Sequence, residues 1–152
     1  MHVYRIDREK RRQNPLTGIG AYLNGGRWNR PGEHVIYTAG SRSLAILEML
    51  MHLNLDKHLP NDRIIVEIFI PDEMLFIKAF DPGPGDTWRR FPYQVETQKT
   101  WANQNDGNLM VLAIPSAIVP QETNYLINPH HPSFPLIQVE HVEFLDIDQR
   151  LY

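Results

Sequence analysis

The sequence predicts an α+β fold built as one domain, and three observations carry this prediction. Short segments rich in β-branched and aromatic residues recur along the chain, as in strands. One segment, beginning at Ser41, has the apolar content of a strong helix. Strands and helices do not alternate regularly along the chain. An α+β arrangement is therefore favoured over a doubly wound sheet.

Each element follows from its local pattern. Residues 41–53 predict a helix with Ser41 or Ser43 as its N-cap, and its apolar residues point in nearly all directions, so we expect it to be buried. The glycines between residues 18 and 26 predict a loop built for close approach. Residues 81–108 predict a mostly irregular segment, of a length that is often functional. We expect strands at residues 2–6, 34–38, 63–70, 109–114 and 142–147.

Composition narrows the possible classes of function. The 152 residues carry 15 basic and 18 acidic side chains, a formal charge of -3, so no overall charge attracts the chain to nucleic acid or to an anionic membrane. There is no cysteine, which excludes disulfides, thiolate metal sites and a cysteine nucleophile. Residues 1–152 contain no linker, no signal-peptide pattern and no apolar run long enough to span a bilayer. We expect a single cytoplasmic domain.

Glu48 is the most informative residue, because it stands inside the apolar helical segment. It shares a helical face with Leu44, Ala45 and Met51, so its carboxylate is expected to be wholly or partly buried. A buried carboxylate needs a cation or a hydrogen-bond donor, unless it lines a cleft where its charge is used. A structural salt bridge and a functional carboxylate both remain open on this pattern.

Three other residues give weaker indications of a functional site. Arg27 follows Gly25 and Gly26, where a guanidinium can meet a phosphate in a bidentate fork, although such a sequence also occurs in plain turns. Tyr37 precedes the Glu48 helix and is either a core residue or an aromatic wall of a cleft. Ser116 ends an apolar strand, where a hydroxyl can face a ligand or cap a turn.

Several established motifs are absent from the sequence. The histidines do not show the helical spacing of a zinc protease, so no metal site is predicted. There is also no Gly-x-Gly-x-x-Gly before a helix, no Walker sequence and no Gly-x-Ser-x-Gly. The common nucleotide-binding and serine-hydrolase folds are therefore not expected.

Taken together, the segments of the chain resemble the RES family in order and spacing, from about residue 3 to residue 134. In the middle region the chain has Thr97-Gln98-Lys99-Thr100-Trp101, without the glycine that many members carry there. The segments that carry the resemblance are Tyr4-Arg5-Ile6, Gly18-Ile19-Gly20-Ala21, Gly25-Gly26-Arg27-Trp28-Asn29, Val35-Ile36-Tyr37-Thr38-Ala39, Ser43-Leu44-Ala45-Ile46-Leu47-Glu48, Ile114-Pro115-Ser116-Ala117, Val119-Pro120, Asn124-Tyr125-Leu126-Ile127-Asn128-Pro129 and His131-Pro132.

This resemblance implies a fold and an activity. RES proteins have mainly antiparallel sheets with a few helices, similar to ADP-ribosyltransferases. They act as toxins of type II toxin-antitoxin pairs with an Xre-like antitoxin, and they cleave the nicotinamide-ribose bond of NAD. The resemblance implies no cofactor beyond NAD as substrate, and no contact with nucleic acid except through the antitoxin complex.

The family's arginine, glutamate and serine correspond by position to Arg27, Glu48 and Ser116. We expect Glu48 to stabilise the ribosyl cation, Arg27 to bind pyrophosphate or an incoming phosphate, and Ser116 to contact a ribose or the carboxamide. Tyr37 would stack on or orient the nicotinamide ring, and Gly25 and Gly26 would admit the dinucleotide backbone. The remaining candidates for the pocket wall are Tyr4, Arg5, Trp28 and Asn29.

Three alternative functions stay open. A protein ADP-ribosyltransferase would use the same site and deliver ADP-ribose to a macromolecule. A non-catalytic binding module would pair Glu48 with Arg27 structurally and would leave NAD intact. Nucleic-acid binding could use the aromatic and basic run Trp88-Arg89-Arg90-Phe91, although arginines flanked by core aromatic residues explain that run more simply.

Overall fold

The protein folds around one seven-stranded sheet. Its computed structural model describes residues 1–53, 61–72 and 77–151. The strands lie in the order β4-β5-β6-β2-β1-β3-β7, and every neighbouring pair is antiparallel except β4 with β5. The α+β class and the mainly antiparallel pairing are thus confirmed. The strands are β1 (His2–Arg8), β2 (Ile36–Ala39), β3 (Arg63–Phe69), β4 (Ile77–Ala79), β5 (Val111–Pro115), β6 (Thr123–Ile127) and β7 (Gln138–Phe144).

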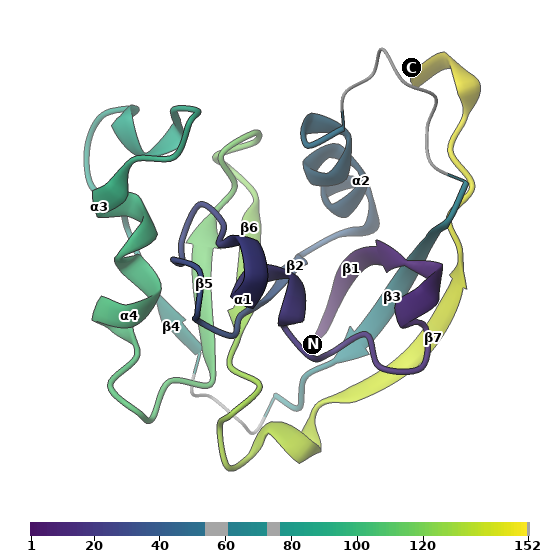
Figure 1. Cartoon of the computed structure of the whole chain (residues 1–152), viewed down its shortest axis with the longest axis horizontal. Coiled ribbons are helices and arrows are strands. Elements are labelled where there is room, and N and C mark those ends of the chain that lie inside the picture. Colours follow the sequence, from purple (N-terminus) through teal and green to yellow (C-terminus); the bar gives the residue numbers. More distant parts are fainter. Residues whose placement is uncertain (54–60, 73–76, 152) are drawn as a thin grey trace.

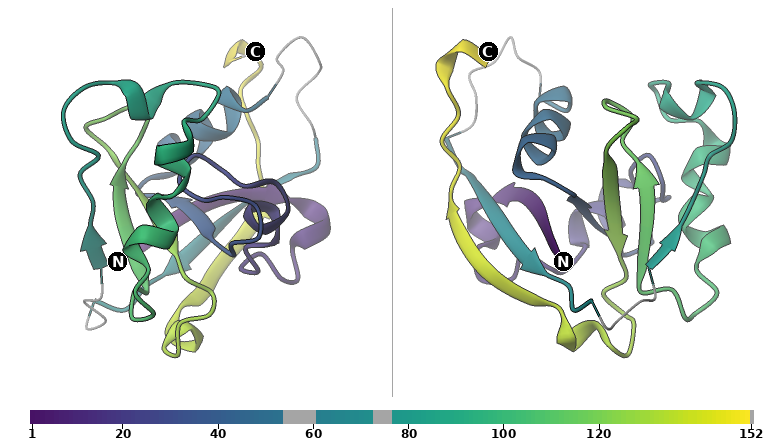
Figure 2. Two further views of the ribbon diagram at one scale, coloured as in Figure 1. Left: turned by 60° about the vertical axis from the view of Figure 1, so that its left-hand side comes forward. Right: turned by 180° about the vertical axis from the view of Figure 1, so that it is seen from behind.

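The sheet bends strongly, so that its two ends face each other across helix α2 (Figure 1). The end formed by β1, β3 and β7 lies on one side of α2, and the end formed by β4, β5 and β6 lies on the other, as the view from behind also shows (Figure 2). The short helices α3 and α4 flank the β4 end (Figures 1 and 2). The helices are α1 (Ile19–Asn24), α2 (Arg42–Met51), α3 (Val95–Gln98) and α4 (Thr100–Gln104), with 3-10 turns at Glu9–Arg11, Thr87–Arg89, Phe134–Leu136 and Gln149–Leu151.

The described residues form three apolar core clusters distributed along this bent sheet. The largest contains the inward-facing residues of β1 and β3, including Val3, Val66 and Ile68. A second joins Trp28 and Trp101 to the β5 and β6 side of the sheet. The third places Leu44 and Ala45 of α2 against Ala39, with Tyr4 and Ile6 of β1 packed around them. The third cluster anchors α2 to the middle of the sheet, and so fixes the position of Glu48.

The strands predicted at residues 2–6, 34–38, 63–70 and 109–114 correspond to β1, β2, β3 and β5. The strand predicted at residues 142–147 is displaced, because β7 begins at Gln138 and ends at Phe144. It is an edge strand with mostly exposed side chains, so its sequence lacks the alternation that burial of one face imposes. The prediction missed β4, which has three residues, and β6, which has five.

Helix α2 begins as predicted but is less buried than expected. Ser41 is its N-cap, and its side chain accepts a 3.1 Å hydrogen bond from the Leu44 amide. Leu44 and Ala45 are buried against the sheet, whereas Leu47 is 40% exposed and Met51 is 68% exposed. The expectation of burial on nearly all sides is therefore wrong. Only one face of the helix packs on β1 and β2, and its apolar composition does not show which face is covered.

The two segments predicted to be irregular contain helical turns. The glycine-rich segment holds α1, whose N-cap Gly18 has a φ of 65° and whose C-cap Gly25 has a φ of 68°. Such values favour glycine, so these residues mark the ends of a short helix. Residues 81–108 contain a 3-10 turn, α3 and α4, and Trp101 within them is buried. Trp101 thus anchors this segment on the β5 side of the core, while most of its other residues are exposed or half-buried.

No helix in the described part of the chain is long and apolar enough to cross a membrane.

Candidate active site

Glu48 lies in α2 at the point where the helix passes the ends of β5 and β6. Its side chain is partly buried, as predicted, and its Oε1 atom accepts two hydrogen bonds. Ser116 Oγ donates one at 2.8 Å, and Asn124 Nδ2 donates the other at 2.6 Å. Among the described residues, none donates to Oε2 and none forms an ion pair with Glu48. Neutral donors thus hold one oxygen and leave the other available to a ligand.

Ser116 is fully committed to this arrangement. It ends the apolar run of β5 and has no exposed surface. Its hydroxyl donates to Glu48 and accepts hydrogen bonds from the amides of Ile118 and Val119, both at 3.1 Å. A serine hydroxyl has one donor and two acceptor positions, and all three are in use. The geometry therefore favours an orienting role for Ser116, where we expected a direct contact with substrate.

Asn124 is the site residue that sequence reasoning missed most clearly. It stands in β6, opposite Ala39 of β2 and Ile114 of β5, and this register directs its amide to Glu48. Its Oδ1 atom is buried without a hydrogen-bond partner among the described residues. The signal that could have found it is its place at the start of the segment Asn124-Tyr125-Leu126-Ile127-Asn128-Pro129, which carries part of the family resemblance.

Arg27 lies close to Glu48 but does not pair with it. Its Nη1 atom donates to the carbonyl oxygens of Trp88 at 2.6 Å and Arg90 at 3.0 Å. Burial lowers the pKa of Arg27, although Tyr93 and the charge of Glu48 act in the opposite direction. No ion pair joins Arg27 and Glu48 in the described structure, so the pairing that the binding-module alternative required is contradicted. In the described chain, Nε and Nη2 of Arg27 make no hydrogen bond and can receive an anion.

Tyr37 fastens the turn that carries Arg27. Its hydroxyl donates to Asn29 Oδ1 at 2.8 Å and accepts from the Trp28 amide at 3.1 Å. Burial raises the pKa of Tyr37, which keeps the hydroxyl protonated. A Cβ atom on Gly26 would lie 2.6 Å from that hydroxyl. The glycine is therefore explained by its approach to Tyr37, where we expected an approach to the dinucleotide.

The neighbours of this turn are also structural. Asn29 is fully buried, and its Nδ2 donates to the carbonyl oxygens of Ala21, Arg30 and Glu33. Trp28 is 3% exposed and packs in the second core cluster. Both residues were predicted as pocket wall. The structure instead places them beneath the turn, where they determine the position of Arg27.

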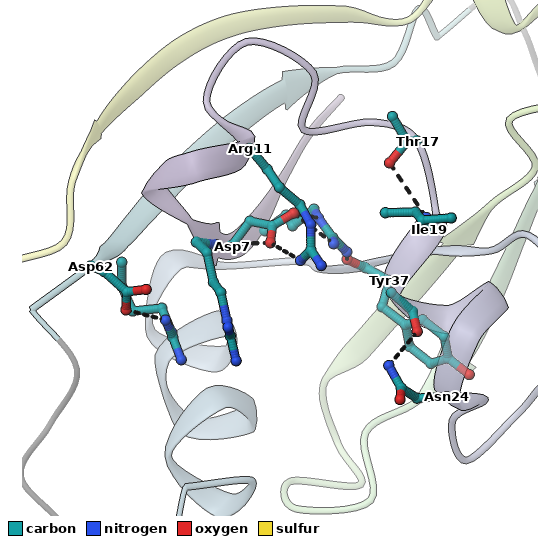
Figure 3. Close-up of polar contacts among 11 residues, drawn as sticks. Asp7, Arg11, Thr17, Ile19, Asn24, Tyr37 and Asp62 are labelled. Carbon is teal, nitrogen blue, oxygen red and sulfur yellow. Dashed lines mark hydrogen bonds and ion pairs between the residues drawn. The ribbon is translucent and has the colours of Figure 1, made fainter.

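Tyr4 and Arg5 point to opposite sides of β1 and support the site indirectly. The Tyr4 hydroxyl donates to Glu67 at 3.4 Å. Arg5 donates to the Tyr37 carbonyl at 3.2 Å and pairs with the buried Asp7 at 2.9 Å. Asp7 also pairs with Arg11 at 2.7 Å (Figure 3). Arg5 thus connects the strand of Tyr37 to a buried ionic cluster, and neither Tyr4 nor Arg5 contacts Arg27 or Glu48 through a hydrogen bond.

Tyr93 is a second residue that the sequence did not reveal. The guanidinium carbon of Arg27 lies 5.0 Å from the centre of the Tyr93 ring, within the range of a cation-π contact. Burial raises the pKa of Tyr93, Arg27 lowers it, and the charge of Glu48 raises it further. Tyr93 therefore lies where the fields of Arg27 and Glu48 overlap. It belongs to residues 81–108, whose role the sequence left open.

The run Trp88-Arg89-Arg90-Phe91 does not form a continuous stacking surface. The Trp88 ring packs on Trp28 with a centroid separation of 5.7 Å, and Arg89 donates to the Ala117 carbonyl at 2.9 Å. Phe91 alone among the aromatic residues of this run is highly exposed, at 77%. Arg27 also donates to the Trp88 and Arg90 carbonyls, so the run lies beside the candidate site.

Other hollows and clusters lie outside this set. One surface hollow is lined by Phe80, Pro115 and Glu122 beside β5, and another by His34, Trp101 and His130. In the described part of the chain, one group brings three potential metal ligands within 4.8 Å of one another, namely His2, Glu67 and Glu140. Glu67 is already paired with Arg42 at 2.7 Å, and His2 contacts Glu140 at 2.7 Å. We therefore assign no metal to this group.

Comparison with known proteins gives consistent matches. The RES domain family matches residues 2–148. A Prs ADP-ribosylating toxin from Sphingobium sp. is 40% identical over 142 residues, covering 90% of this chain and 86% of that protein. A protein named Toxin Res from Photorhabdus laumondii is 36% identical over 155 residues, covering 99% of this chain and 97% of that protein.

A solved structure has the same fold. A chain of the M. tuberculosis MbcT-MbcA toxin-antitoxin complex superimposes with a TM-score of 0.74, at 16% sequence identity, over 95% of this chain and 83% of that one.

Fold and site together define an α+β protein in which a carboxylate, held through one oxygen, lies beside a partly buried arginine. Matches over nearly the whole chain then give the family. This chain belongs to the RES domain family, as its segments predicted.

Proposed function

We propose that this protein is the toxin of a bacterial type II toxin-antitoxin pair and depletes NAD by cleaving its nicotinamide-ribose bond. The single observation that carries the proposal is the state of Glu48. Its Oε1 is anchored by Ser116 and Asn124, while its Oε2 has no partner among the described residues. A carboxylate held in this way is preorganised for a ligand that carries or develops positive charge.

The chemistry of NAD cleavage matches that arrangement. As the bond between the ribose and the nicotinamide nitrogen breaks, its electron pair leaves with the nicotinamide as a neutral ring. Positive charge then develops on the ribose, as in glycoside hydrolysis. Glu48 would accept a hydrogen bond from a ribose hydroxyl and stabilise that cation. No general acid is required, because the leaving group is already neutral.

The acceptor completes the reaction. Water would yield ADP-ribose and a proton, and inorganic phosphate would yield ADP-ribose carrying a phosphate at the reacting carbon. Arg27 supports both versions, because its free Nε and Nη2 atoms can bind either the pyrophosphate of NAD or an incoming phosphate. Tyr37, Trp28 and Asn29 support the turn that presents this guanidinium.

The test is nicotinamide release from NAD by the purified protein freed of antitoxin, measured with and without inorganic phosphate. We expect release from the wild type and a loss of most turnover in Glu48→Gln, which keeps the size of the side chain and removes its charge. Release that depends on phosphate identifies a phosphorylase, and release without it identifies a hydrolase or a transferase. Absence of release, or a Glu48→Gln variant with full turnover, would overturn the proposal.

A second candidate is a protein ADP-ribosyltransferase, in which a macromolecule takes the place of water or phosphate. The 40% identical relative named an ADP-ribosylating toxin favours it. The two activities separate by mass spectrometry, because transfer adds ADP-ribose to a target protein while cleavage leaves free ADP-ribose or its phosphate. Slow nicotinamide release that accelerates when a target protein is added would favour the transferase.

The proposal also includes a partner and a compartment. The relatives named Toxin Res and the fold shared with a toxin-antitoxin complex support a cognate antitoxin, which we propose to be Xre-like. Such a pair would act in the cytoplasm, where NAD is consumed. Co-purification of a tagged Glu48→Gln variant with the product of a neighbouring gene, identified by mass spectrometry, tests this partner. Recovery of the variant without a bound protein would contradict it.

A further inference from the structure

The two tyrosines near Arg27 differ in how their hydroxyls are used. The Tyr37 hydroxyl has one donated and one accepted hydrogen bond, to Asn29 and from Trp28. The Tyr93 hydroxyl makes no hydrogen bond with any described residue. Tyr37 is therefore built into the scaffold, whereas the Tyr93 hydroxyl has no partner in the described part of the chain.

The position of Tyr93 places that hydroxyl in the candidate site. Its ring lies against the Arg27 guanidinium, with 5.0 Å between the guanidinium carbon and the ring centre. Its side chain is only partly buried, so its open part remains accessible to a ligand. The same loop is fixed at two further points, by Arg27 on the Trp88 and Arg90 carbonyls and by Arg89 on the Ala117 carbonyl. Tyr93 is thus held without using its own hydroxyl.

We infer that Tyr93, rather than Tyr37, is the tyrosine that contacts the substrate, and that its hydroxyl donates a hydrogen bond to a phosphate oxygen of NAD beside Arg27. This inference rests on the proposed function. The raised pKa of Tyr93 keeps its hydroxyl protonated at neutral pH, so it acts as a neutral donor. Arg27 supplies the charge, and Tyr93 adds a directed hydrogen bond to the same anion.

The test compares Tyr93→Phe with Tyr37→Phe, and uses Tyr22→Phe as the matched control. Tyr22 is 39% exposed and lies outside the candidate site, stacked on His34. For Tyr93→Phe we expect an unchanged melting temperature, a KM for NAD raised about tenfold and a kcat within about twofold, because a hydrogen bond to a charged group has been lost from binding. For Tyr37→Phe we expect a lowered melting temperature. For Tyr22→Phe we expect no change in melting temperature, KM or kcat.

A binding measurement separates this inference from the proposed function. ADP-ribose contains the pyrophosphate and lacks nicotinamide, so its binding reports on the phosphate contact alone. The double variant Glu48→Gln/Tyr93→Phe should bind ADP-ribose with a Kd about tenfold higher than that of Glu48→Gln. If the wild type released no nicotinamide, the proposed function would fail whatever the Kd showed. If it did release nicotinamide while KM and Kd were unaffected by Tyr93→Phe, the inference alone would fail. A melting temperature lowered as much as that of Tyr37→Phe would also overturn it, because it would reveal a structural bond at that hydroxyl.

Discussion

Ser116 and Glu48 stand 68 residues apart in the chain, and a 2.8 Å hydrogen bond joins the serine hydroxyl to one oxygen of the carboxylate. Asn124 donates to the same oxygen from the neighbouring strand. Two neutral donors on one oxygen fix the carboxylate in space without neutralising it. The charge of Glu48 therefore stays available to whatever the site binds.

Loss of the serine hydroxyl should reduce turnover more than binding. In Ser116→Ala, Glu48 loses one of its two anchors, so we expect kcat for nicotinamide release to fall about tenfold or more with little change in KM. Ser43→Ala is the matched control, because Ser43 is an exposed serine on α2, the helix that carries Glu48. Steady-state kinetics distinguish the outcomes. A raised KM at unchanged kcat would show that Ser116 contacts NAD directly.

Placing a second carboxylate beside Glu48 should reduce turnover more than removing the Asn124 amide does. Asn124→Asp would replace the donor that lies 2.6 Å from Glu48 with a group that cannot donate when ionised. Two adjacent carboxylates cannot both ionise freely, so we expect kcat to fall about a hundredfold, further than in Asn124→Ala. Asn103→Asp, at an exposed position of α4, controls for the added charge. Equal kcat values in Asn124→Asp and Asn124→Ala would contradict this account.

The fork of Arg27 should not be replaceable by lysine. One nitrogen of Arg27 donates to two carbonyl oxygens, and no other described residue accepts a hydrogen bond from its remaining nitrogens, which can bind an anion. A lysine has one ammonium group and cannot serve both partners, so Arg27→Lys should raise the KM for NAD roughly tenfold or more. Arg8→Lys, at an exposed position of β1, serves as control. An Arg27→Lys variant with wild-type KM would show that any cation suffices there.

Gly26 and Gly20 should respond oppositely to alanine. A Cβ on Gly26 would approach the Tyr37 hydroxyl to 2.6 Å, so Gly26→Ala should lower the free energy of unfolding by about 1–3 kcal/mol. Gly20 lies inside α1 with open space around its Cβ direction, so Gly20→Ala should be neutral or stabilising by up to about 1 kcal/mol. Urea denaturation measures both. A neutral Gly26→Ala would mean that the turn shifts without cost.

Asp7 should give the protein a stability that disappears in acid. Burial raises the pKa of Asp7, but Arg5, Arg11 and the Arg8 amide outweigh it, so the pKa lies below its ordinary value of 3.8. A carboxyl whose pKa is lower in the folded than in the unfolded protein stabilises the fold at any pH above its unfolded-state pKa. That contribution is lost as the pH falls through the folded-state pKa.

At pH 7 we therefore expect Asp7→Asn to lower the free energy of unfolding by about 3 kcal/mol, because two arginines lose their partner. Below about pH 4 the difference in free energy of unfolding between wild type and variant should become smaller. Urea denaturation at pH 7 and pH 3 measures it, with the exposed Asp86→Asn as control. A gap of constant size across this range would contradict the assignment.

Strands were predicted correctly from the sequence where burial in the core imposes an apolar pattern on them. Strands β1, β2, β3 and β5 supply much of the core, so their apolar residues are visible in the sequence. The edge strand β7 is exposed along most of its length, and nothing in its composition marks its start.

The same distinction holds within the site. Glu48 stood out because a charge within an apolar helix must be compensated. Tyr93 gave no signal in the sequence and Asn124 gave only its place in a segment of the family resemblance, because what matters is the contact each makes with a residue far away in the chain. The roles of Tyr37 and Ser116 depend on which hydroxyls are already bonded, and that information exists only in three dimensions.

The strand order has a consequence for the timing of synthesis. Strand β2 lies between β1 and β6, so the sheet stays divided until residues 123–127 are available for pairing. Translation adds roughly 5–20 residues per second, and an emerging chain holds Arg27 and Glu48 well before Ser116 and Asn124 exist. The anchored carboxylate can therefore form only after Asn124 has been synthesised, and a product interrupted before that residue carries Arg27 and Glu48 without both donors that hold the carboxylate.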